Sequence, residues 1–384
     1  MTPTEIAATS APALTPLAGL IAPHIGAQEL SVYRGALTPR QFDAPDAETE
    51  ALVSSAALHD LGWMRRVEVR GEDRFRWLSG MVTNMVNDLA ANAGAWNLVL
   101  NAQGRIQGDL WVWRDGERLE LEIAADQFDK LLAHLNRFII MDDVELVPLE
   151  GETALGLIGP LADELLARIG LPALQDALTQ TRSAWRDGEI LIRKGYGVLA
   201  PHYELWAPAS LLAQLWHALR EAGATAAGTA ALEAFRIAEG IPLYGIDIAE
   251  RDLPQETSQI RALHFNKGCY LGQEIVERIR SRGNVHRHLR HLELDGPIPP
   301  PGTELFVRAD GAAQPATAAS GHITSSAALR LGAETRVFAL AMLRAEAELP
   351  GHGLSYSTES AAGTARVLAS PPALNPQGTG KPPL

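Results

Sequence analysis

Hydrophobic and polar residues alternate along several stretches between residues 64 and 147, as expected for half-buried β-strands. This two-residue period is carried by Val67, Val69, Trp96, Leu98, Leu100, Leu110, Val112, Leu119, Leu121 and Ile123. Residues 71–78 are predicted to form a short helix, and Asp126 is predicted to cap a second helix whose apolar positions recur at helical spacing. A last strand is expected near Val144. We therefore expect a compact α+β unit with the order strand, helix, three strands, helix, strand, and with antiparallel pairing.

The rest of the chain mixes both kinds of element. Two strands and two helices are predicted at residues 155–158, 190–198, 210–221 and 230–239. Past Arg290, short apolar segments alternate with Gly, Pro and Asp, which predicts a small all-β domain. Within it, the Ala- and Ser-rich residues 311–331 are expected to form a loose hairpin or a loop.

The composition excludes several classes of protein. The 384 residues are 46% hydrophobic, as is usual for globular proteins, and carry a formal net charge of -13. So acidic a chain does not attract nucleic acid or an anionic membrane through its bulk charge, and neither is an expected partner. Because no apolar run could span a bilayer and no signal-peptide pattern is present, we predict a cytoplasmic location. Residues 1–12 and 370–384 are expected to be disordered tails.

The only cysteine of the chain lies in the run Lys267-Gly268-Cys269-Tyr270-Leu271-Gly272-Gln273-Glu274. A disulfide within the chain is therefore impossible, which favours a reducing compartment. Cys269 has two interpretations: a reactive thiolate favoured by the nearby Lys267, or a buried cysteine that packs as a small hydrophobic residue. One thiolate cannot hold an iron–sulfur cluster alone, because clusters take about four such ligands. If Cys269 is functional, we expect a transient contact or a redox role.

Three further stretches accompany this run. They are His59-Asp60-Leu61-Gly62 with Thr83-Asn84, Leu100-Asn101-Ala102-Gln103-Gly104-Arg105 with Asp109-Leu110, and the segment from Phe235 to Gly245. In order and spacing they resemble the superfamily of the glycine-cleavage T protein, an aminomethyltransferase. The cysteine-centred run resembles the YgfZ-type branch of that superfamily, whose folate-binding members support iron–sulfur cluster enzymes. The resemblance covers residues 51–294 best.

The resemblance implies an α+β fold of three domains in a T-protein-like ring around a central folate cavity, with a small C-terminal β-barrel domain. Residues 15–60 and 148–250 would form a split first α+β domain. Residues 61–147 would form an inserted α+β domain. Residues 251–369 would contain the signature motif and the β-barrel.

The resemblance also implies a tetrahydrofolate site. Asp109 would contact the reduced pterin, Arg236 would pair with the glutamate tail, and Tyr244 or Trp113 would stack on the ring. Cys269 would lie near the mouth of the cavity. Asp109 and Cys269 are thus the candidate catalytic residues, and Asp109, Arg236 and Tyr244 are the candidate cofactor-binding residues. The signature motif comprises Lys267, Gly268, Cys269, Tyr270, Gly272, Gln273 and Glu274.

Each of these residues also has a structural interpretation. An aspartate at a strand start can bond a backbone amide, and core packing explains Tyr244 and Trp113 equally well. Arg236 can pair within its own helix with Glu233 or Glu239, each three residues away.

Basic residues gather towards the C-terminal side of the signature motif. They are Arg278, Arg280, Arg282, Arg287 and Arg290, with His286, His288 and His291 interspersed. On an extended backbone the first three arginines would share one face, which would suit polyglutamylated folate, RNA phosphate or an acidic protein, or would simply be solvated. The histidines lack a familiar ligand set, so no metal site is predicted. Phosphate-binding glycine loops and the Gly-x-Ser-x-Gly elbow are absent from the sequence.

Two departures from the T protein bear on function. Gly108-Asp109 stands where the T protein has a pair of aspartates, and residues 197–202 offer no match for its pterin-contacting acid. We therefore predict a tetrahydrofolate-binding accessory protein for iron–sulfur cluster assembly or repair, with iron–sulfur apoproteins or cluster carriers as partners. A tetrahydrofolate-dependent aminomethyltransferase of the glycine-cleavage type is the alternative. A related demethylase or oxidase is a third interpretation, but such enzymes carry a separate flavin domain.

Overall fold

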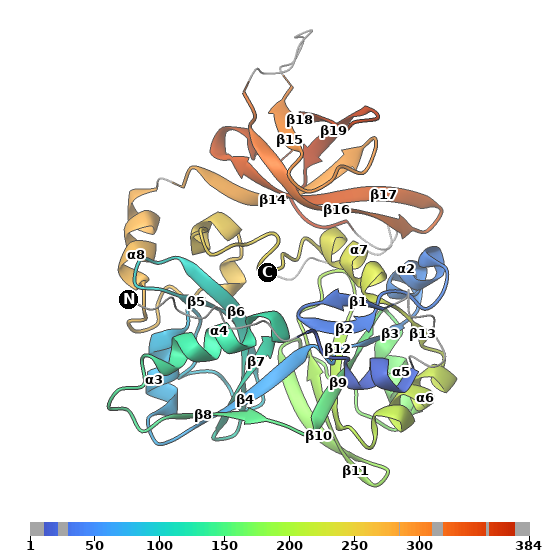
Figure 1. Cartoon of the computed structure of the whole chain (residues 1–384), viewed down its shortest axis with the longest axis vertical. Coiled ribbons are helices and arrows are strands. Elements are labelled where there is room, and N and C mark those ends of the chain that lie inside the picture. Colours follow the sequence, from blue (N-terminus) through green and yellow to red (C-terminus); the bar gives the residue numbers. More distant parts are fainter. Residues whose placement is uncertain (1–10, 22–29, 284, 309–317, 351–352, 373–384) are drawn as a thin grey trace.

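The computed structural model describes residues 11–21, 30–283, 285–308, 318–350 and 353–372. Two α+β lobes lie side by side, and a β-barrel sits above them (Figure 1). The expected α+β class with a C-terminal β-barrel is confirmed. The predicted disordered tails lie outside the described residues, except for residues 11–12 and 370–372.

The first lobe is a five-stranded antiparallel sheet in the order β5-β6-β7-β4-β8, with two helices. Its elements are β4 (Met64–Arg70), α3 (Arg74–Met81), β5 (Gly94–Leu100), β6 (Ile106–Asp115), β7 (Arg118–Ala124), α4 (Ala125–Asn136) and β8 (Glu145–Leu149). This is the predicted order, because alternate residues such as Val67, Leu110 and Leu121 bury one face of the sheet under α4. The predicted cap is wrong: α4 begins at Ala125, so Asp126 lies in the first turn.

The second lobe is a six-stranded sheet in the order β10-β11-β12-β9-β3-β13. It comprises α1 (Pro16–Ile21), β1 (Leu30–Tyr33), β2 (Ala36–Pro39), α2 (Pro45–Ser54), β3 (Ala57–Asp60), β9 (Glu152–Ile158), α5 (Ala162–Arg168), β10 (Thr179–Trp185), β11 (Gly188–Lys194), β12 (His202–Pro208), α6 (Leu212–Ala222) and β13 (Thr225–Ala226), of which β1 and β2 form a separate hairpin. The sheet thus joins chain segments from both sides of the first lobe. Only β13 pairs in parallel, with β3, among the strands that the structure describes here.

The His-Asp-Leu-Gly stretch at the end of β3 has a structural role. The Asp60 carboxylate accepts hydrogen bonds from the hydroxyl groups of Thr15 and Thr38 and from the backbone N–H of Gly62, the last two at 2.7 and 2.8 Å. It thereby fastens the N-terminal segment to the sheet. The imidazole of the buried His59 lies against Gly156, where an added Cβ would stand 2.0 Å from Nε2.

His59 should make stability depend on pH. Burial lowers its pKa from 6.5 to about 4, against the opposing effect of its bond to the Asp60 carbonyl. Because the unfolded chain binds the proton more tightly, the free energy of unfolding should fall as pH drops from about 6.5 to about 4, by roughly 3 kcal/mol for this residue. Urea unfolding of the His59→Asn variant should show a correspondingly flatter pH profile than the wild type.

The matched control for this experiment is His217→Asn, which removes an exposed histidine from α6. That variant should keep the wild-type pH profile. An unchanged profile in His59→Asn would contradict the assignment.

The barrel is closed in the order β14-β17-β16-β15-β18-β19. Its strands are β14 (Arg287–Asp295), β15 (Glu304–Val307), β16 (Gly321–Leu331), β17 (Glu334–Arg344), β18 (Gly353–Ser357) and β19 (Ala362–Val367). The loose hairpin or loop expected at residues 311–331 is wrong for residues 321–331. They form a long strand, because they pair with β17 along its length and pack against α7 (Thr229–Glu239).

The signature motif leads into a helix, α8 (Gln273–Arg282), so the extended backbone that would have placed the first three arginines on one face is not formed. The helix starts from Gly272 in a left-handed conformation, at φ 80°, and an added Cβ there would stand 2.6 Å from the Asn101 carbonyl oxygen. The glycine therefore permits a close approach to the turn between β5 and β6. Within the described ranges, no helix has the length and apolar character that crossing a membrane requires.

Candidate functional site

An inner cavity of about 180 Å³ lies where β1, β5 and β6 meet the loops after β11 and α7. Its wall is rich in aromatic side chains, contributed by Tyr33, Trp63, Trp96, Trp111 and Tyr196. Flat apolar surfaces with a few polar groups between them are typical of sites for small planar ligands. The polar groups in this wall are Arg34, Asp109, Glu122, Gln127 and Arg261.

Asp109 lies on β6, on the same face as Trp111, as the two-residue period requires. Its carboxylate accepts hydrogen bonds from Trp96 Nε1 at 2.9 Å and from Gln127 Nε2 at 2.8 Å. Gln127 in turn accepts the backbone N–H of Asp109 at 2.9 Å. Two donors therefore fix the carboxylate at the cavity wall and leave it further lone pairs for a ligand.

Gly108, which precedes Asp109 on β6, lies close to side chains of α4. A Cβ at this position would stand 2.6 Å from Gln127 Oε1 and 2.8 Å from a methyl group of Leu131. A larger residue here would therefore require the side chains of Gln127 and Leu131 to shift, and Gln127 is the residue that orients Asp109.

Two other carboxyl groups, which the sequence analysis did not identify, belong to this region: Glu122 lies at the floor of the inner cavity, and Glu204 contacts Glu122 from behind it. Glu122 Oε2 accepts hydrogen bonds from Trp113 Nε1 at 2.9 Å and from Arg193 Nη1 at 2.8 Å. Burial, followed by the charge of Glu122, raises the pKa of Glu204 well above its usual value, which favours a neutral acid that can donate to Glu122. An acidic residue in the apolar strand β7 was the signal that could have indicated this position.

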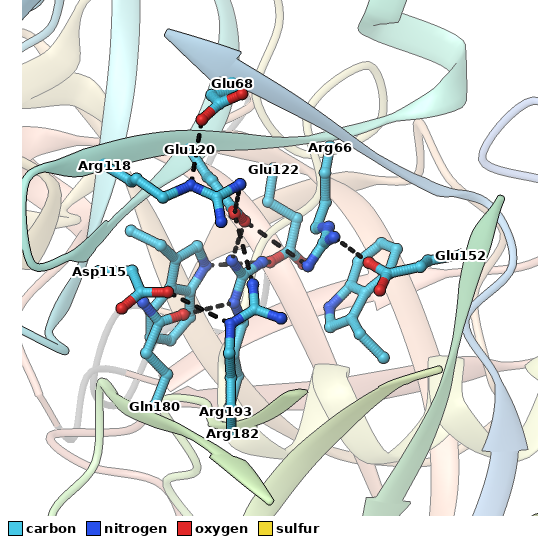
Figure 2. A network of polar contacts seen from close by, with 12 residues as sticks. Arg66, Glu68, Asp115, Arg118, Glu120, Glu122, Glu152, Gln180, Arg182 and Arg193 are labelled. Atoms are coloured by element: carbon cyan, nitrogen blue, oxygen red, sulfur yellow. Dashed lines mark hydrogen bonds and ion pairs between the residues drawn. The ribbon is translucent and has the colours of Figure 1, made fainter. Parts of the chain in front are cut away.

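A network of buried ion pairs supports this floor (Figure 2). Arg193 of β11 is fully buried and reaches Glu120 and Glu122 of β7, with nitrogen–oxygen distances of 2.6 and 2.8 Å. Arg66 of β4 pairs with Glu152 of β9. The network therefore joins the sheets of the two lobes directly beneath the cavity.

The structure does not bring Arg236 together with Asp109. All five N–H groups of its guanidinium have partners in the protein: two carboxylate oxygens of Glu233, one of Asp247, the carbonyl of Ile241 and the hydroxyl of Ser325. The pair with Glu233 is the intrahelical alternative considered from the sequence. Arg236 is not among the residues that line the inner cavity, and its side chain is 9% exposed.

Tyr244 and Trp113 are also absent from the residues that line the inner cavity. The Tyr244 hydroxyl accepts a hydrogen bond from Lys130 Nζ at 3.0 Å, and its carbonyl accepts one from Arg34. The Trp113 ring is buried beneath the guanidinium of Arg193, at 4.8 Å. The aromatic rings that the structure places in this cavity are therefore the five of the wall, and not those of Tyr244 and Trp113.

Cys269 is exposed, and it lines neither the inner cavity nor the larger cleft next to that cavity, which is described below. The motif around it wraps the end of α3: Lys267 Nζ donates to the carbonyl oxygens of Ser79, Val82 and Asn84 at 2.6–2.7 Å. Burial lowers the pKa of Lys267 to about 7. Lys267 thus acts as a helix cap that holds the loop carrying the thiol.

An outer cleft of about 370 Å³ adjoins the inner cavity, and Tyr196 and Arg261 belong to the walls of both. The cleft lies between the loop of residues 258–261, the strand β14 and residues 369–371. In the part of the chain that the structure describes, no group of three or more His, Cys, Asp or Glu side chains is arranged to hold a metal ion.

The fold of the chain is that of the glycine-cleavage T protein. The glycine cleavage system aminomethyltransferase T from Bartonella henselae superimposes with a TM-score of 0.82 at 20% identity, covering 94% of this chain and 98% of that one. The family model described as the GCVT N-terminal domain matches residues 22–267. The chain belongs to this family.

Named relatives agree with this assignment. The aminomethyltransferase of Rubrobacter xylanophilus is 32% identical over 270 residues, which cover 69% of this chain and 72% of the relative. That of a Thermoanaerobacter species is 26% identical over 283 residues, which cover 71% and 77%.

Proposed function

We propose that the chain binds tetrahydrofolate in the inner cavity and acts as a folate-dependent one-carbon transferase of the aminomethyltransferase type. The observation that carries the proposal is the position of Asp109, whose carboxylate is fixed on the wall of a cavity lined with aromatic rings. The names of the relatives support the aminomethyl substrate.

The side chains of the wall suit a reduced pterin. Tyr196, Trp96 and Trp111 offer flat apolar faces. A reduced pterin presents N–H groups that can donate hydrogen bonds to a carboxylate. Asp109 would hold such an amine and accept a proton from it during transfer. Glu122 offers a further acceptor at the floor.

Calorimetric titration with tetrahydrofolate tests the binding step, and methylene-tetrahydrofolate production from an aminomethylated lipoyl carrier tests the transfer. Saturable binding together with turnover and ammonia release is the expected result. Binding without turnover would reject the transferase and keep the folate site, whereas absence of binding would reject both.

A second function is favoured by the signature motif: an accessory role in iron–sulfur cluster assembly or repair, as in YgfZ-type proteins. The specific observation is that Cys269 is exposed in a loop anchored by Lys267, where a protein partner could reach the thiol. An exposed thiol can exchange or coordinate transiently, while a cluster needs about four ligands and so needs a partner's residues.

Replacing Cys269 with Ala tests this second function. In cells that depend on the protein, the activities of iron–sulfur enzymes should fall to the level of the deletion strain, while the purified variant keeps its affinity for tetrahydrofolate. Undiminished enzyme activities would remove the thiol from the mechanism.

A further inference from the structure

Arg261 is a cation without a carboxylate partner, at the junction of the inner cavity and the outer cleft. Its guanidinium lies over the Tyr196 ring at 4.3 Å and over the Trp96 ring at 5.2 Å. Among the residues that the structure describes, none forms an ion pair with it, and its Nε is buried without a hydrogen-bond partner. A partly buried cation in this state gains strongly from an anionic ligand, because its own desolvation is not compensated within the protein.

Glu239 is an acidic residue on the wall of the outer cleft, but its carboxylate already has partners within the protein. Its Oε1 accepts the backbone N–H groups of Val198 and Leu199, both at 2.9 Å, and it also pairs with His202. Its side chain is fully buried and holds the loop after β11 in place, so its charge acts on Arg261 only from a distance and no ion pair joins the two.

The other basic side chains that line the two cavities are paired with an acid or are neutral. Arg34 pairs with Asp126 at 3.4 Å, and Arg290 pairs with Glu348 at 3.2 Å while donating to the Ser258 hydroxyl. Burial lowers the pKa of His291 to about 4, so its ring is neutral near pH 7.

The sizes of the two cavities also indicate that a folate ligand would occupy both of them. Sites for drug-sized ligands usually measure about 300–1,000 Å³. The inner cavity, at about 180 Å³, is too small for a whole folate, while the adjoining outer cleft measures about 370 Å³. A pterin ring in the inner cavity would therefore leave the rest of the molecule to pass Tyr196 and Arg261.

We propose that the outer cleft binds the glutamate tail of the folate, with Arg261 as the residue that pairs with its carboxylate. This inference rests on the proposed folate site and assigns the tail to a different arginine from Arg236, whose donors are all used. Longer γ-glutamyl tails would extend along the same cleft, which Arg290 also lines.

Calorimetry with three ligands tests the tail site: tetrahydropteroate in the form of its uncharged benzamide, which has neither glutamate nor a free carboxylate, and the monoglutamyl and triglutamyl forms of tetrahydrofolate. The wild type should bind both glutamylated ligands more tightly than tetrahydropteroate, by about 10- to 100-fold, the range of a charge-assisted hydrogen bond. Arg261→Gln should lose this advantage and keep its affinity for tetrahydropteroate. Arg278→Gln, which removes an exposed charge outside both cavities, should behave as the wild type.

The outcomes separate the two proposals. Equal wild-type affinities for all three ligands would overturn the tail site while keeping the folate site, and this comparison needs no variant to fold. Equal weakening of all three ligands in Arg261→Gln would also overturn it, since the residue would then serve the ring. If none of the ligands binds, the proposed function fails, and the tail site fails with it.

Discussion

Replacing Arg193 with Met is expected to lower the free energy of unfolding by about 3–5 kcal/mol, the usual effect of removing one partner from a buried ion pair. The side chain is fully buried and pairs with Glu120 and Glu122 (Figure 2). Burial alone would raise the pKa of Glu120, but the guanidinium groups of Arg193 and Arg66 outweigh it and lower that pKa. Without Arg193, two carboxylates remain close together in a desolvated site.

Arg118→Met is the matched control for this substitution. Arg118 pairs with Glu68 and Glu120 of the same network, but its side chain is 46% exposed. Its loss should cost under about 1 kcal/mol, because solvent screens exposed pairs. Urea unfolding followed by circular dichroism measures both variants. Equal small losses in the two would show that the buried network does not hold the lobes together.

Local pattern predicted the first lobe because apolar and polar residues alternate along its strands, although in β5 and β7 the polar face is buried as well. In β4, β6 and β7 the apolar residues recur at every second position, and this period is visible without knowledge of the partner strands. In β16 the signal is weak, since Ala and Ser occupy many positions and the strand is defined by its pairing with β17. The same holds for α8, whose Ile275 and Val276 suit a strand as well as a helix.

Less of the candidate site than of the fold could be predicted from the sequence. Asp109 was found through the resemblance to a known family, and the alternation along β6 places it beside Trp111. Arg261 and Glu122 were missed because they meet only where distant segments converge. The resemblance assigns Arg236 to a ligand, whereas the structure pairs it with Asp247. This pair forms only because the loop after α7 turns back on the helix, which the sequence does not reveal. Pairing between distant residues thus decides which charged side chains remain free for a ligand.

In the proposed function, binding and transfer both depend on the carboxylate of Asp109, and the environment of this carboxylate makes Asn a severe replacement. Both oxygens accept hydrogen bonds, from Trp96 Nε1 and from Gln127 Nε2. An Asn side chain has one acceptor oxygen and one NH₂ group, so in either orientation a donor would face a donor. Gln127 cannot rotate to compensate without losing the backbone N–H of Asp109.

Asp109→Asn is therefore expected to weaken tetrahydrofolate binding by about 10-fold or more, and to lower the rate of one-carbon transfer by about 100-fold or more. Asp129→Asn changes the same charge at an exposed position of α4 outside the cavity, and should leave both quantities unchanged. Calorimetry reports the affinity, and methylene-tetrahydrofolate formation reports the rate. A variant that matches the wild type in both affinity and rate would remove Asp109 from the site. A loss of rate at unchanged affinity would instead restrict Asp109 to the transfer of a proton.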